Sequence, residues 1–193
     1  TTFRANNGGE PVGGGITRME QVQRLLRAGA DKVSLNTSAY VKPELITEIA
    51  KRHGGQCVVV SVDVRPDLAG GWRCYSHAGC RDTGRDVISW AREAQDRGAG
   101  ELLITSIERD GTLQGYDLAL IEAVASAVSI PVIASGGAGT YVDMVAAVTE
   151  AGASAVAAAS LFHFTEQTPA GAKAALAQAG VPVRKPYLTG ATG

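Results

Sequence analysis

Short apolar runs alternate along this chain with segments in which apolar residues recur at the spacing of one helix face. The runs predict six buried strands, at residues 11–12, 32–35, 57–62, 102–105, 130–133 and 154–158. The periodic segments predict helices at residues 18–27, 86–96, 117–128 and 169–179, one that Pro43 opens, and one through residues 142–148. Near-continuous apolar strands, each followed by a helix, are typical of a parallel sheet covered by helices. Two architectures fit this pattern: a TIM-barrel-type (β/α) fold and an open doubly wound sheet.

A repeated βαβ unit helps to choose between them. Residues 130–164 contain a strand, a Gly-rich turn, a helix and a second strand, and residues 11–37 show the same order. The matched positions are Gly15 with Gly137, Ala30 with Ala153, and Asn36-Thr37 with Ala159-Ser160. Glycine at the carboxyl end of a strand lets an anion approach bare backbone N–H groups. The repeat therefore predicts internal pseudo-symmetry and two similar anion sites, although the turn glycines of unrelated βαβ units would give part of the match.

Polar residues stand where five of the predicted strands end. They are Asn36, Asp63, Thr105, Ser135 and Ser160. Both architectures place their sites at the carboxyl ends of strands. No GxGxxG motif follows a first strand, which argues against a dinucleotide fold, and the repeated turns favour the barrel. A closed barrel of this kind needs eight strands, so the pattern predicts six βα units of an eight-unit barrel.

Composition and charge narrow the class of protein. The chain has 193 residues and a formal net charge of −1, and no basic run occurs, so we expect no nucleic-acid partner. No apolar run reaches the ~20 residues of a membrane span, and no signal-peptide pattern opens the sequence. We therefore expect the protein to reside in the cytoplasm and not to associate with a membrane. Cys57, Cys74 and Cys80 include no Cys-x-x-Cys pair, which predicts neither a disulfide framework nor a zinc site. We expect no metal and no cofactor.

The sequence predicts one barrel domain with two short extensions. Residues 1–10 show no periodicity and are expected to form an irregular arm. Residues 11–184 form the incomplete barrel, and residues 185–193 form a loose tail. Within the barrel, residues 65–84 make an unusually long connection, and its centre at 72–75 predicts a small hairpin arm.

Six motifs resemble one enzyme family. They are PVGGGI at 11–16, LLRAGADKVSLNT at 25–37, CVVVSVD at 57–63, GAGELLITSIERDGTLQGYD at 98–117, SIPVIASGGAG at 129–139 and AASLFHF at 158–164. Together they resemble the cyclase subunit of imidazole glycerol phosphate synthase, a (βα)8 enzyme of histidine biosynthesis, over residues 11–184. The isomerase acting one step earlier shares the fold and the phosphosugar ligand. Asn36-Thr37, Thr105-Ser106 and Gly115-Tyr116-Asp117 follow the cyclase pattern.

The resemblance implies roles for particular residues. One phosphate of a bisphosphorylated phosphosugar nucleotide would bind at Gly15, Asn36 and Thr37, and the other at Asp110, Gly111, Gly137 and Ser160. Asp63 would be a catalytic acid–base group, and Thr105 and Ser135 would contact the polar middle of the substrate. Lys32 and Glu101 would belong to a charged ring that admits ammonia from a glutaminase partner, with Gln56 on the same face. Alternatively, Asp63 only caps its own loop, and the hydroxyls of Thr105 and Ser135 form hydrogen bonds with the local backbone. Lys32 and Glu101 would then be ordinary solvated charges.

Two further expectations concern activity. The family's first two βα units, with its first catalytic aspartate and a following lysine, have no counterpart in the sequence, so the resemblance implies an impaired cyclase. The alternative is a non-catalytic phosphosugar-binding barrel fragment.

Assembly follows from the strand count. Six strands leave open edges near Val12 and Val156, beside an inner face that the sequence predicts to be rich in Val, Ile and Ala. We therefore expect a homo-oligomer, as a two-fold dimer that joins these edges. The alternative is that residues 1–10 fold over one edge.

Overall fold

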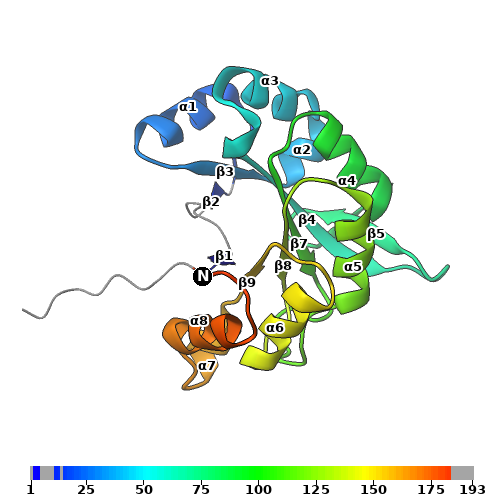
Figure 1. Cartoon of the computed structure of the whole chain (residues 1–193). Coiled ribbons are helices and arrows are strands. Elements are labelled where there is room, and N and C mark those ends of the chain that lie inside the picture. The colour runs from blue at the N-terminus through cyan, green and yellow to red at the C-terminus, as the bar shows by residue number, and fades with distance from the viewer. Residues whose placement is uncertain (1, 5–10, 14, 184–193) are drawn as a thin grey trace, which may run out of the picture.

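The sheet decides between the two architectures. The computed structural model describes residues 2–4, 11–13 and 15–183. Its parallel strands are β2 (Pro11–Gly13), β3 (Lys32–Leu35), β4 (Val58–Pro66), β7 (Glu101–Ser106), β8 (Val132–Ser135) and β9 (Ala155–Ala157). They pair in chain order from β2 to β9. A doubly wound sheet reverses its strand order, so this order identifies part of a TIM-barrel fold, and Figure 1 shows the sheet curving with its helices outside.

Helices follow the strands as predicted. They are α1 (Met19–Arg27), α2 (Thr37–Val41), α3 (Glu44–His53), α4 (Val87–Asp96), α5 (Leu118–Ala127), α6 (Tyr141–Thr149), α7 (Ser160–Phe164) and α8 (Pro169–Gln178), with the 3-10 helix η1 (Gly55–Cys57). Polar side chains cap the N-termini of several helices. At α4, the Asp86 carboxylate accepts hydrogen bonds from the N–H groups of Ile88 and Ser89. The sequence missed α2 and α7, because five residues are too few to show a helical period. Within the described ranges, none of the helices has the length and apolarity needed to cross a membrane.

The two faces of the sheet differ in chemistry. On β4, Val58, Val60 and Val62 are fully buried in the core between sheet and helices. Ser61 and Asp63 alternate with them and are only half-buried, on the interior face. The expectation of an inner face rich in Val, Ile and Ala is therefore only partly correct. Its members include Val59, Ile133 and Ala155, all buried, but Ser, Asn, Asp and Thr occupy the interior positions near the carboxyl ends of the strands.

One edge of the sheet carries an extra strand. β1 (Thr2–Arg4) pairs antiparallel with β9, with Thr2 opposite Ala157 and Arg4 opposite Ala155. For these three residues the prediction of an irregular arm is wrong, because the free edge of β9 offers unpaired N–H and C=O groups that the segment satisfies. Residues 1, 5–10 and 14 and the predicted tail at 185–193 lie outside the described residues. At the other end of the strand order, β2 pairs with β3.

The predicted hairpin arm is confirmed and is longer than the pattern indicated. β5 (Trp72–Ser76) pairs antiparallel with the end of β4, placing Tyr75 opposite Asp63. β6 (Arg81–Asp86) pairs antiparallel with β5. The arm therefore continues directly from the strand that carries Asp63, and its turn at residues 77–80 returns toward the sheet.

Candidate active site

Polar side chains of three neighbouring strands form one row near the carboxyl ends. Asp63 of β4 pairs in register with Thr105 of β7, and Thr105 pairs with Ser135 of β8. Paired positions of a parallel sheet point to the same face, and all three residues are half-buried. The structure thus brings three of the predicted site residues together on the interior face.

Asn36 connects this row to β3. Its Nδ2 donates to the Asp63 Oδ2 at 3.1 Å and to the Ser61 carbonyl at 3.2 Å. Its Oδ1 accepts from the Thr37 hydroxyl at 3.4 Å. Both ends of the carboxamide are therefore engaged, which fixes the side chain beside the carboxylate.

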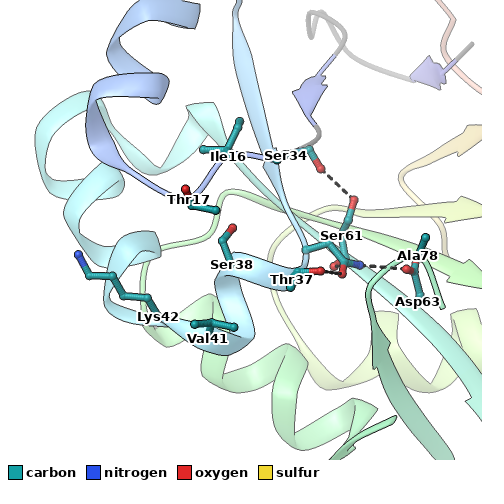
Figure 2. Close-up of a pocket in the computed structure, with 12 residues that line it drawn as sticks. Ile16, Thr17, Ser34, Thr37, Ser38, Val41, Lys42, Ser61, Asp63 and Ala78 are labelled. Carbon is teal, nitrogen blue, oxygen red and sulfur yellow. Dashed lines mark hydrogen bonds between the residues drawn. The ribbon is translucent and has the colours of Figure 1, made fainter. Parts of the chain in front are cut away.

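A cavity of about 660 Å³ opens beside this cluster. Figure 2 shows Ser34, Ser61 and Asp63 on one side of it and Thr17, Ser38 and Lys42 on the other. Its lining includes four predicted site residues, namely Gly15, Asn36, Thr37 and Asp63. Gly15, the member of this group in the β2–α1 connection, is exposed. We call this cavity the large pocket.

The large pocket contains hydroxyls that the sequence analysis missed. Ser34 lies on β3 two residues before Asn36, and Ser61 lies on β4 two residues before Asp63; the Oγ atoms of the two serines are 2.8 Å apart. The period of two that places Asn36 and Asp63 on the interior face places these serines there as well. This alternation of serine with valine could have predicted the two hydroxyls, but it is a weak signal in strands that contain so many valines.

The environment of Asp63 suits proton transfer. Burial raises the pKa of its carboxyl group, the hydrogen bond from Asn36 lowers it, and the negative charge of Asp110 raises it further. The net effect is a pKa above the ordinary value, so the group holds its proton more readily near neutral pH than a solvated aspartate does. The Asp63 Oδ2 accepts this hydrogen bond from Asn36, a residue that follows a different strand.

A second, smaller cavity of about 120 Å³ lies at the β8–β9 end. We call it the small pocket. Five predicted residues line it: Asp110, Gly111, Ser135, Gly137 and Ser160. Asp110 is exposed, and its negatively charged carboxylate would repel an anion, so it suits the predicted anion site only through its backbone or through water.

Gly137 is required where it stands. Its φ is +109°, and a Cβ atom built there would lie 2.2 Å from the carbonyl oxygen of Gly115. The two backbones are also joined by a hydrogen bond of 2.8 Å from the Gly115 N–H to the Gly137 carbonyl. Only glycine allows the β7–α5 loop to approach β8 this closely.

The sequence repeat is also visible in the structure. Each copy ends in a five-residue helix, α2 after Asn36 and α7 after Ala159. The residues before both helices adopt similar backbone angles, with φ −120° at Asn36 and −126° at Ala159. The copies occupy opposite ends of the parallel strand order; Asp63 and Thr105 lie on the two strands between them, and Ser135 ends β8 of the second copy.

A charged pair lies at the opposite end of the interior face. Lys32 and Glu101 begin β3 and β7, and the Lys32 Nζ is 2.5 Å from the Glu101 Oε1 across β4. Their side chains are only 12% and 9% exposed. Gln56 does not join them: it is exposed in η1, and its Nε2 donates to the His53 carbonyl.

Fold and site together define a class of protein. Parallel strands in chain order, helices outside and polar pockets at the carboxyl strand ends are the features of a (β/α) barrel protein whose site lies on that face. Comparison with known proteins then specifies the family. The model of the family described as "Histidine biosynthesis protein" matches residues 10–168. The imidazole glycerol phosphate synthase subunit HisF of Hyphomonas neptunium is 54% identical over 173 residues, which are 90% of this chain and 68% of that protein. The chain belongs to the histidine biosynthesis protein family.

Proposed function

We propose that the chain binds a bisphosphorylated phosphosugar nucleotide and carries out, with impaired efficiency, the ammonia-dependent ring closure and cleavage of an imidazole glycerol phosphate synthase cyclase. The observation that carries this proposal is the position of Asp63. It lines the large pocket and stands in one row with Thr105 and with Ser135, which lines the small pocket. A substrate with a phosphate at each end would span this row.

The pockets would hold the two phosphates. The small pocket has the size and the exposed glycine backbone for a bare phosphate, with the Ser160 hydroxyl as a further donor. The large pocket would hold the other phosphate at Gly15, Asn36 and Thr37, with room for the sugar or base attached to it. Anchoring both ends would place the reacting middle against the row of polar side chains.

Asp63 would move protons during ring closure and cleavage. A carboxyl group with a raised pKa can accept a proton from the attacking nitrogen and return one to the leaving group. Thr105 and Ser135 would orient the substrate's polar middle through their hydroxyls.

Ammonia would reach the site from the other end of the interior face. The Lys32–Glu101 pair lies there, and we assign it to the entrance that faces a glutaminase subunit. Because the pair is close and mostly buried, it would have to separate for ammonia to pass. Gln56, exposed on the same side, would belong to the partner contact.

Turnover with ammonium salts tests the proposal, because they replace the glutaminase. We expect product formation from the phosphosugar nucleotide and a loss of about 10²–10⁴-fold in Asp63→Asn. Asp67→Asn is the matched control, since Asp67 lies in the turn after β4 and its carboxylate binds the backbone of Ala69 and Gly71. Equal rates in the wild type and Asp63→Asn would contradict the catalytic role.

Binding without turnover is the second candidate. The two pockets do not depend on Asp63 for their glycine backbones, so a phosphosugar could bind even where the reaction is impaired. Calorimetry with a bisphosphorylated sugar distinguishes the two candidates. Saturable binding with no turnover in ammonium salts would favour a binding module, and absence of saturable binding at millimolar ligand would reject both.

A further inference from the structure

The turn of the hairpin arm contacts the large pocket. Ala78 in this turn lines the pocket. The neighbouring backbone N–H of His77 donates to the Thr37 Oγ1 at 3.0 Å. Because forty positions separate His77 from Thr37, this contact is tertiary, and it ties the arm to the end of β3.

The turn has an unusual backbone that local contacts maintain. His77 and Ala78 have φ values of +53° and +54°, which non-glycine residues rarely adopt. The Ser76 Oγ and the His77 Nδ1 are 3.0 Å apart, and Gly79 is buried next to Ile107. Strained backbone of this kind persists only where the surroundings impose it. Here it directs the His77 N–H at Thr37.

The contact continues toward Asp63. A Thr37 hydroxyl that accepts from His77 keeps its own proton for the Asn36 Oδ1, at 3.4 Å. With its oxygen engaged there, the Asn36 carboxamide presents its NH₂ group to the Asp63 Oδ2, at 3.1 Å. The reverse orientation of the amide would place oxygen against the carboxylate. The hydrogen bonds therefore form a directed chain from the arm to Asp63.

We propose that the β5–β6 turn is a positioning element of the site: through the His77 N–H it orients Thr37 and Asn36, and through them the Asp63 carboxylate. The inference deepens the proposed function, on which the acid–base role of Asp63 rests. The positioning itself is independent of turnover, so the two can fail separately.

The proposal predicts a direction for the titration of Asp63. The hydrogen bond from Asn36 lowers the pKa of Asp63. If the turn no longer holds Thr37, Asn36 becomes free to turn away and this lowering weakens, so the pKa of Asp63 rises. The other titratable groups whose charges act on Asp63 or respond to it are Asp110 from the β7–α5 loop and Tyr40 of α2, and both lie outside residues 77–80.

The decisive variant replaces residues 77–80 with a two-residue Asn-Gly turn. Ser76 and Arg81 are paired across the hairpin, so the strands can be joined by this tight connection. Carbon-13 NMR of the aspartate carboxyl groups, with the Asp63 signal assigned by Asp63→Asn, measures the pKa directly. We expect an upward shift, together with about 2- to 12-fold weaker binding of a bisphosphorylated sugar, the range for one lost hydrogen bond.

Thr37 variants separate positioning from general damage. Thr37→Val should raise the pKa of Asp63 as the turn exchange does, and Thr37→Ser should leave this pKa unchanged. Combining Thr37→Val with the turn exchange should raise the pKa little further. Asp67→Ala, which perturbs the opposite end of the same arm, should leave it unchanged. An unchanged Asp63 midpoint in the turn exchange, or fully additive shifts in the double variant, would overturn the proposal. A shift without turnover would uphold it and count against the proposed function alone.

Discussion

The large and small pockets are built from the same sequence pattern but differ greatly in size. Each has a strand, a turn glycine, a helix, a second strand and a five-residue helix. One measures about 660 Å³ and the other about 120 Å³. At Gly15 an added Cβ would meet nothing within 4 Å, whereas at Gly137 it would meet the Gly115 carbonyl. The repeated unit itself therefore does not set the volume.

The neighbouring strand accounts for the difference. Beside β8 runs β7, and the loop after it contributes Asp110 and Gly111 to the lining of the small pocket and packs Gly115 against Gly137. Beside β2, the described residues provide β3 on one side, and the other side has no strand paired to it. Two copies of one motif thus acquire different binding volumes because their neighbours differ.

The largest expected effect concerns the open side of β2. An unpaired parallel edge invites pairing with another chain, and we expect the 193-residue chain, of 19.9 kDa, to form a two-fold dimer of about twice that mass. β1 already covers the edge of β9, so among the described parallel strands β2 is the one with an unpaired side. Light scattering at micromolar concentration measures the mass. A monomer whose unfolding does not depend on concentration would contradict the prediction.

The two matched glycines should differ strongly in their tolerance of a side chain. Gly137→Ala forces a Cβ to within 2.2 Å of a backbone oxygen at φ +109°, so we expect it to destabilise by about 3–5 kcal/mol, from overpacking together with backbone strain. Gly15→Ala meets open space at φ +68° and should cost only about 1 kcal/mol. Urea unfolding measures both free energies.

The slope of the unfolding curve serves as the control for the glycine pair. Equal slopes in the wild type and in both variants show that the comparison concerns stability alone. Similar losses in the two variants would mean that the pockets are more alike than their volumes indicate.

Removing one serine hydroxyl from each pocket should affect the binding of inorganic phosphate differently. Ser160→Ala removes a hydroxyl that lines the small pocket and should weaken phosphate binding by about 2- to 12-fold, the range for one hydrogen bond. Ser34→Ala in the large pocket is the matched control, because the Ser34 hydroxyl is engaged by Ser61. Calorimetry measures both affinities. A larger loss in Ser34→Ala would reverse the assignment of the bare-phosphate pocket.

The smallest effect is electrostatic and links the pockets. Since the folded state raises the pKa of Asp63, ionisation of this group costs the folded state free energy. That cost is absent below the unfolded pKa of about 3.9, grows as the pH rises through the folded pKa, and is constant above it. Asp63→Asn should therefore be more stable than the wild type at neutral pH, and the difference should vanish in acid. Urea unfolding across pH tests this.

Asp110→Asn provides the matched test from the small pocket. The Asp110 charge raises the pKa of Asp63, so its removal should lower the Asp63 titration midpoint, as measured by NMR. A midpoint that stays in place would show that the two pockets are electrically independent.

The sequence predicted the strands well because their signal is local. Residues 32–35 coincide with β3, and the turn glycines line the two pockets together with all the predicted strand-end polar residues except Thr105. Ser34 and Ser61 escaped notice because their alternation is masked by valines that face the helices. The role of the hairpin turn was also out of reach, since the contact between His77 and Thr37 spans forty positions and carries no periodic signature.

The strand order of this sheet also predicts how the molecule folds and which of its parts unfold locally most often. Because each parallel strand pairs with the next along the chain, every pairing closes a short loop, and folding can spread outward from the centre. β4 and β7 share the longest register, six residue pairs from Val59–Glu101 to Val64–Ser106, and their amides should exchange with solvent most slowly. Exchange should quicken toward β2 and β1. Fluctuations would then loosen the outer βαβ units before they disturb the strand that holds Asp63.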